Sequence, residues 1–313
     1  MINPFSGHSI TIWQVKTCSG GFPANSAAAR NYILVKMDQI KAVSVDIKVI
    51  DDSVDYNLTP LPNNKWNDDI MPALTDELKK AGHPLIGWGY VYLRDPEGEA
   101  KKAAERILEL KLDGFAIDAE GEAKKAKQGF ATRYITTLRS MVPDIPLALN
   151  TYRYPSLHPE FPWMEFLNHM DAARGDVHMP QVYWLGDEHP NAPADQLTRS
   201  FEELKKLKDL PVVPEGSVWA TKVAGAPWST TAEQIKIFAR TAWKLGCPGL
   251  SYWAWDQIQK KGFNSDWWSA IEWVGANWPI STPPTPQPDQ RWDKSITAWA
   301  RRQPDPYIGP DPE

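Results

Sequence analysis

The stretch GFAIDAEGEA, residues 114–123, runs from alternating apolar residues into three acids. Asp118, Glu120 and Glu122 fall within five positions, where the like charges of carboxylates repel unless solvent, a cation or a shared proton relieves them. Side chains at positions i and i+2 of a strand share one face, so Asp118 and Glu120 are predicted to point into one small space. A carboxyl that such a neighbour keeps protonated near neutral pH has the property that a general acid needs.

Glycoside hydrolysis uses this device, with one protonated carboxyl and a second group that acts as nucleophile, base or electrostatic partner. The pattern therefore predicts that Asp118 and Glu120 are functional carboxyls of this kind. A structural alternative is that the acids only favour the N-terminus of the helix that GEAKKAKQG opens. That alternative accounts well for Glu122, but not for Asp118, which still belongs to the strand.

A third acid, Glu215 in VVPEGSVW, falls at the end of another predicted strand. We interpret it as a candidate for a catalytic nucleophile, less favoured than the alternative role given next. The competing interpretation is a loop acid that pairs with a nearby lysine such as Lys222.

Short apolar, β-branched or aromatic runs alternate with amphipathic helical patterns along most of the chain, as in a parallel sheet with crossover helices. The predicted strands are residues 9–15, 43–50, 84–93, 114–120, 146–152, 178–184, 211–219 and 249–255. The helical patterns include 95–112, 130–142, 194–208 and 231–246, where apolar residues recur at spacings of three and four. Eight such units predict an α/β fold, the (β/α)₈ TIM barrel.

The barrel is predicted to occupy residues 1–276 as a single domain. Residues 277–290 are rich in proline and predict a linker, and 291–313 predict a C-terminal tail with one short helix.

In a barrel of this kind the working residues come from the C-terminal ends of the strands. The polar and aromatic residues at these ends predict a cleft that binds substrate. They are Trp13, Lys48, Trp88, Tyr90, Asn150, Tyr152, Gln181, Tyr183, Trp253, Trp255 and Asp256.

Two of these predictions have structural alternatives. Lys48, two positions after Asp46, could serve to neutralise one of the acids. Trp253 and Trp255, placed on one strand face, line the mouth of the barrel or pack in its interior.

Composition excludes several classes of protein. The net charge is −5, with 34 basic and 39 acidic residues and no basic block, which argues against a nucleic-acid partner. No uncharged apolar run is long enough to span a membrane. No signal peptide is visible in this chain. Localisation therefore stays open, and the sequence is compatible with extracellular action. The sixteen tryptophans suit a protein that stacks aromatic rings on sugars.

Cysteine and histidine usage indicates neither a disulfide framework nor a metal centre. Cys18 and Cys247 are expected to be free thiols, and the six histidines lack ligand spacing. We therefore expect no metal, no cofactor and no membrane or nucleic-acid partner. The expected partner is a glycan, bound by a monomer.

IGWGYVYLRDPEGEAKKAAERI followed by DGFAIDAEGE resembles the third and fourth strand units of glycoside hydrolase family 25, the lysozyme-type muramidases, or a related uncharacterised glycosidase-like barrel family. The likeness continues through LALNTY and GLSYWAWDQ. It implies that Glu120 is the general acid and that Asp118 assists through the acetamido group of the substrate or a bound water. The first strand departs from the family, because TIWQVKTCSGG carries no acid.

The sequence thus predicts a glycoside hydrolase that cleaves a polysaccharide by carboxylate general acid catalysis, with bacterial peptidoglycan as one candidate substrate. The alternative is a barrel without catalytic activity that binds carbohydrate or protein.

Overall fold

The computed structural model describes residues 3–60, 67–260 and 263–278. Its central sheet contains β1 (Gly7–His8), β2 (Thr11–Ile12), β3 (Val45–Asp51), β7 (Leu85–Val91), β8 (Gly114–Ala119), β9 (Leu147–Tyr152), β10 (Val177–Val182), β11 (Glu215–Ser217) and β14 (Gly249–Trp253). Neighbouring strands follow the order β1-β14-β11-β10-β9-β8-β7-β3-β2 and pair in parallel.

The sheet closes because β1 and β2 are two halves of one strand position. β1 pairs with β14 and β2 pairs with β3, and only Ser9 and Ile10 separate the halves. Both ends of the sheet order therefore meet, and the described residues form eight strand positions. The predicted (β/α)₈ barrel is confirmed.

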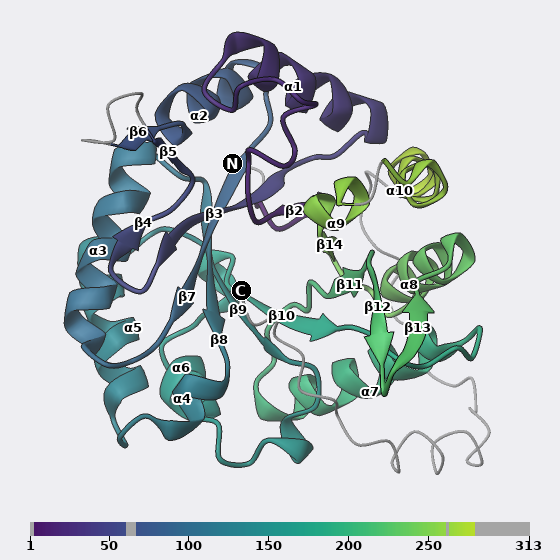
Figure 1. Ribbon diagram of the computed structural model, residues 1–313. Helices are drawn as coiled ribbons and strands as arrows, with labels where there is room; N and C mark the ends of the chain where they lie inside the picture. Colours follow the sequence, from purple (N-terminus) through teal and green to yellow (C-terminus); the bar gives the residue numbers. More distant parts are fainter. Residues whose placement is uncertain (1–2, 61–66, 261–262, 279–313) are drawn as a thin grey trace.

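The longer helices surround the sheet, as Figure 1 shows. They are α1 (Ala27–Ile40), α2 (Met71–Lys80), α3 (Pro96–Leu110), α5 (Phe130–Met141), α7 (Ala192–Leu207), α8 (Ala232–Lys244) and α10 (Ser265–Asn277). The short helices α4 (Gly121–Lys125), α6 (Trp163–Leu167) and α9 (Trp255–Gln259) lie in the segments that connect the longer elements. Each of the four helical patterns in the sequence coincides with one of these helices. The apolar stripe of α8, for example, buries Ile235, Phe238 and Ala242.

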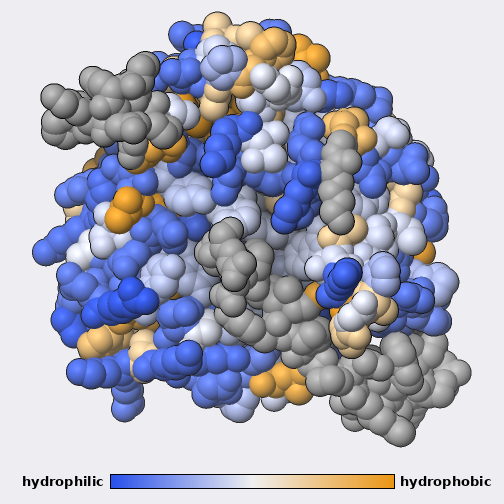
Figure 2. All heavy atoms as spheres, viewed as in Figure 1, coloured by the Kyte–Doolittle hydropathy of each residue, from blue (hydrophilic) through white to orange (hydrophobic). Residues whose placement is uncertain are grey.

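Side chains alternate along the strands as the period of two requires. Phe115 and Ile117 of β8 are fully buried on the helix side, and Asp118 lies on the opposite face, inside the barrel mouth. The outer surface in Figure 2 is mostly hydrophilic, with scattered hydrophobic residues. Both cysteines are buried free thiols, as expected.

Every predicted strand is shorter in the structure, most of all the first and the seventh. The first keeps only β2 from residues 9–15, so that Trp13 lies in the following loop. The seventh keeps only β11, because Pro211 and Pro214 have no N–H to donate to a neighbouring strand. The eighth ends at Trp253.

Short antiparallel strands extend the loops at the mouth. β4 (Val54–Asp55) pairs with the end of β3, β5 (Leu58–Pro60) pairs with β6 (Asn67–Asp69), and β12 (Ala220–Val223) pairs with β13 (Ala226–Ser229). The 3₁₀ turns η1 (Pro155–Leu157) and η2 (Ala172–Arg174) complete the elements.

The predicted tail 291–313, and the predicted linker from residue 279 onward, lie outside the described residues. None of the described helices is long and apolar enough to cross a bilayer.

Candidate active site

Asp118 and Glu120 come together at the C-terminal end of β8. Asp118 belongs to the strand, and Glu120 follows it immediately before α4. Gln181 on β10 joins them, because its Nε2 donates to Glu120 Oε1 at 2.7 Å and lies 3.3 Å from Asp118 Oδ1. Both carboxyls are more than nine-tenths buried. The structure therefore places the two acids around one donor, in the space that the strand periodicity predicts.

Burial makes ionisation of this pair costly. It raises the pKa of Asp118 well above its usual range, and the neighbouring charge of Glu120 adds to the effect. Burial also raises the pKa of Glu120, but the donors Gln181 and Asp118 oppose the shift. The two buried carboxyls therefore favour holding one proton between them in the free protein.

Glu215 lies deeper in the barrel, at the start of β11. Its Oε1 accepts from Thr11 Oγ1 at 2.5 Å, and its Oε2 accepts from the hydroxyl of Tyr183 at 2.5 Å and from Asn150 Nδ2 at 3.2 Å. The carboxylate is 2% exposed, and its burial raises its pKa. Lys222 is exposed on β12, so the interpretation of Glu215 as the ion-pair partner of Lys222 is wrong.

Below Glu215, the interior of the barrel contains another acid, Asp46, which lies on β3 with Lys48. Asp46 Oδ2 accepts from Ser9 Oγ at 3.0 Å and from Ser251 Oγ at 2.6 Å. Its Oδ1 has no hydrogen-bond partner among the described residues. Burial raises the pKa of Asp46 from an ordinary value of 3.8 to about 7, with the charge of Glu215 adding to the shift.

Asp46→Asn is therefore expected to change how stability depends on pH. Between pH 4 and 7 the folded protein binds a proton at Asp46 that the unfolded chain has released, so the free energy of unfolding of the wild type falls as pH rises. This contribution amounts to at most about 1.4 kcal/mol per pH unit. The variant lacks it and gains stability relative to the wild type from pH 4 to pH 7. Urea denaturation of both proteins across this range tests the prediction, and a difference that does not vary with pH contradicts it.

Lys48 stands among aromatic rings and one acid. Its Nζ lies 3.4 Å from Asp51 Oδ1, 4.6 Å from the centre of the Tyr56 ring and 5.0 Å from that of Trp88. Burial lowers the pKa of Lys48, and Asp51, Asp118 and Glu120 oppose the shift. Lys48 forms its ion pair with Asp51. Its charge interacts with those of Asp118 and Glu120 without direct contact.

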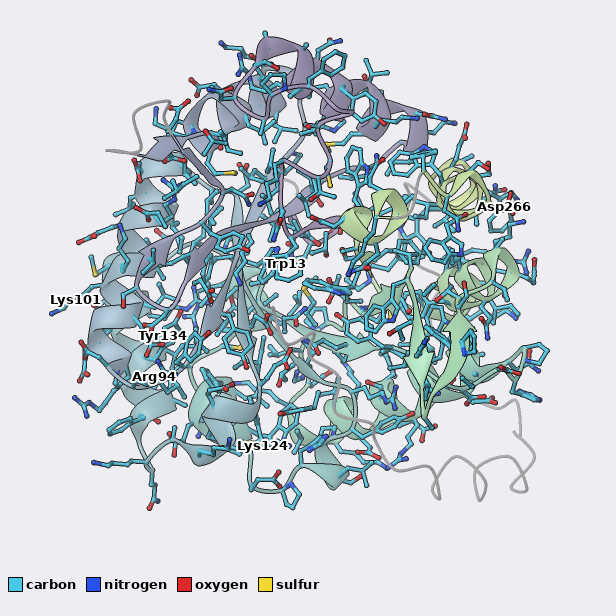
Figure 3. The ribbon with its side chains drawn as sticks, viewed as in Figure 1. Trp13, Arg94, Lys101, Lys124, Tyr134 and Asp266 are labelled. Atoms are coloured by element: carbon cyan, nitrogen blue, oxygen red, sulfur yellow. The ribbon has the colours of Figure 1, made fainter. Side chains whose placement is uncertain are left out.

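Aromatic side chains line the floor and walls of the same region. The Trp253 ring lies 5.4 Å from that of Trp88 and 6.4 Å from that of the half-buried Trp13, which Figure 3 labels near the centre of the view. Trp88 also donates from Nε1 to the carbonyl of Ile12 at 3.3 Å. Such flat faces suit the apolar sides of sugar rings.

Two tyrosines of the predicted cleft lie against charged groups of α4. The hydroxyl of Tyr90 donates to Glu122, and burial raises the pKa of that phenol. The ring of Tyr152 lies 4.0 Å from Lys124 Nζ. Figure 3 labels Lys124 on α4.

The prediction that the last strand extends to Trp255 is wrong. α9 begins at Trp255, whose fully buried ring packs 5.1 Å from that of Trp268. The two oxygens of Asp256 accept from the backbone N–H groups of Trp13 and Gln14, each at 2.7 Å. Asp256 therefore fixes the loop that carries Trp13.

Sequence reasoning also missed Trp219 and Thr11. The Trp219 ring lies 5.1 Å from that of Tyr183, and Thr11 holds Glu215. Alternation along the first strand indicates that Thr11 points inward, but its partner comes from a strand 204 positions away.

Within the described residues, no group of three or more histidine, cysteine or acidic side chains is arranged to hold a metal ion.

Comparison with known proteins finds likeness in structure alone. No protein-family model matches the chain, and no curated protein matches its sequence. A family 18 glycoside hydrolase, a chitinase from Pseudoalteromonas aurantia, is 16% identical over 86% of this chain and 100% of its own, with a TM-score of 0.57. Active domain 2 of a Pyrococcus furiosus chitinase, solved as catalytic-site mutants with chito-oligosaccharides, is 10% identical over 88% of this chain and 97% of its own, with a TM-score of 0.57.

An endo-1,4-β-D-mannanase from Thermotoga petrophila is 11% identical over 87% of this chain and 99% of its own, with a TM-score of 0.60. The chain thus has the barrel fold of these glycosidases. At such identities the likeness concerns the fold.

Proposed function

We propose that this barrel, whose fold is that of chitinases and mannanases, is a glycoside hydrolase in which Glu120 is the general acid. The observation that carries the proposal is the buried Asp118–Glu120 pair, bridged by Gln181 at the C-terminal end of β8. One proton shared by two carboxyls in a dry site is the arrangement that supplies acid catalysis near neutral pH.

One proton on the pair of carboxyls is enough for a complete reaction. A substrate N–H that donates to Asp118 favours its ionised form, and the shared proton then passes to Glu120. Glu120 gives that proton to the glycosidic oxygen as the bond from this oxygen to the anomeric carbon breaks. The carbonyl oxygen of a neighbouring acetamido group on the substrate forms a bond to the same carbon, and water later displaces it with Glu120 as the base.

This mechanism selects the substrate class. It needs a sugar with a 2-acetamido group, whose N–H faces Asp118 and whose carbonyl acts as the nucleophile. Chitin and the glycan strand of peptidoglycan both carry such sugars. The fold of the chitinases and the resemblance of residues 86–122 to lysozyme-type muramidases support this class. Trp13 and Trp253 supply faces on which the sugars stack.

We expect the enzyme to cleave acetylated chito-oligosaccharides or peptidoglycan at least about 100-fold faster than fully deacetylated oligomers of equal length, since the latter lack the internal nucleophile. Reducing ends released from these substrates, with mannan as a further control, provide the measurement.

Equal cleavage of deacetylated oligomers or of mannan would contradict the acetamido mechanism. Retention of the folded protein on one of these polymers, with no release from any, would support the alternative function, a barrel that binds glycans without hydrolysing them.

A further inference from the structure

A chain of hydrogen bonds joins Glu215, inside the barrel, to Glu120 at its mouth. Asn150 Nδ2 donates to Glu215 Oε2 at 3.2 Å, Gln181 Nε2 donates to Asn150 Oδ1 at 2.7 Å, and the same Nε2 donates to Glu120 Oε1 at 2.7 Å. Glu215, Asn150 and Gln181 are here called the amide relay. Its members come from β11, β9 and β10, which are adjacent in the sheet.

The orientation of each amide in the relay depends on the next. An ionised carboxylate only accepts hydrogen bonds, so Glu215 requires Asn150 to turn its Nδ2 inward. The Oδ1 of Asn150 then faces Gln181 and requires a donor in return. If Asn150 turned over, its Nδ2 would meet the Nε2 of Gln181, two donors would face each other, and Gln181 would have to turn its oxygen toward Asn150.

At the mouth, Gln181 is oriented mainly by Glu120 at 2.7 Å and, through a longer bond of 3.3 Å, by Asp118. Once Glu120 carries the proton, it no longer requires a donor from Gln181. The bond from Gln181 to Asn150, fixed by Glu215, then keeps an N–H directed at the carboxyl of Glu120. That N–H stabilises the carboxylate that forms as the proton leaves, in agreement with the lowering effect of Gln181 on the pKa of Glu120.

We propose that Glu215 is a positioning residue, the anchor of the amide relay that aims Gln181 at the acid, and not the nucleophile. The inference rests on the proposed role of Glu120. Three hydrogen bonds, from Thr11, Tyr183 and Asn150, occupy three of the about four lone-pair sites on the two oxygens of Glu215. At 2% exposure it has little surface from which to reach a sugar carbon.

The test moves the charge along the relay. Glu215→Gln removes the anchor, and Asn150→Asp puts two carboxylates against each other. In the double variant the amide at position 215 donates to the carboxylate at position 150, which also accepts from Gln181. The double variant therefore restores both the total charge and the direction of the relay toward Glu120.

We expect each single variant to lower kcat/KM by about 10- to 100-fold, as the loss of a hydrogen bond to a charged group does. The double variant is expected to recover to within about fivefold of the wild type. A second readout does not depend on activity. The side-chain amide hydrogens of Gln181, assigned by their absence in Gln181→Met, are expected to exchange with solvent at least about 10-fold faster in each single variant and to regain protection in the double variant.

Three outcomes overturn the inference. They are loss of activity by several orders of magnitude in Glu215→Gln and in the double variant, recovery of Glu215→Ala by added azide as an external nucleophile, or Gln181 exchange that is the same in all four proteins. If the wild type cleaves no glycan but the exchange pattern follows the expectation, the proposed function fails while the relay stands.

Discussion

Glu120→Gln is expected to lower kcat/KM on the natural polymer by about 10³- to 10⁴-fold, because glutamine keeps the shape of the side chain and loses the proton that the leaving oxygen needs. The loss is expected to be much smaller on an aryl glycoside whose phenol leaves readily without protonation. This dependence on the leaving group is specific to a general acid, and hydrolysis rates on the two substrates measure it.

Glu105→Gln serves as the control, since Glu105 is exposed on α3 and the same chemical change occurs far from the barrel mouth. We expect this variant to match the wild type on both substrates. Equal losses in Glu120→Gln on the polymer and on the aryl glycoside would show that Glu120 has another role.

Asp118→Asn is expected to lower kcat/KM near pH 7 by at least about 100-fold and to move the basic limb of the pH profile to lower pH. In the wild type two carboxyls share one space, and their repulsion raises the pKa at which the pair loses its last proton. With asparagine at position 118 only Glu120 remains, and the like charge beside it is gone. Glu120 then ionises at lower pH, so less of the enzyme holds the catalytic proton at neutrality.

The pH dependence of kcat/KM in wild type and variant measures this shift. Asp266→Asn, at an exposed aspartate of α10 that Figure 3 labels, provides a matched control with an unchanged profile. A basic limb that stays in place or moves to higher pH in Asp118→Asn would mean that the two carboxyls do not share a proton.

Local pattern was sufficient for the barrel and for the pair at its mouth. Side chains along residues 114–120 alternate between the two faces of the strand, which puts Asp118 and Glu120 on the same face independently of the rest of the chain. Helical spacing in segments such as 231–246 requires a sheet to cover, and repeated units of this kind close into a barrel. These features follow from periods of two and 3.6 residues, which the sequence displays directly.

Boundaries depended on more than local pattern. GLSYWAW is one unbroken aromatic run, and nothing in it marks the point after Trp253 where the strand gives way to α9. Trp255 belongs to the helix because its ring fills the space beside Trp268 of α10, a contact between elements that the local run does not encode.

The sequence by itself determined the fold class and the acid pair, since both follow from the periodicity of single elements. Only the tertiary structure decided the partners of Glu215. Thr11 lies on β2, Asn150 lies on β9 and Tyr183 follows β10 directly, and the closure of the sheet brings them around one carboxylate. The register between strands sets these contacts, and register is a property of the assembled sheet.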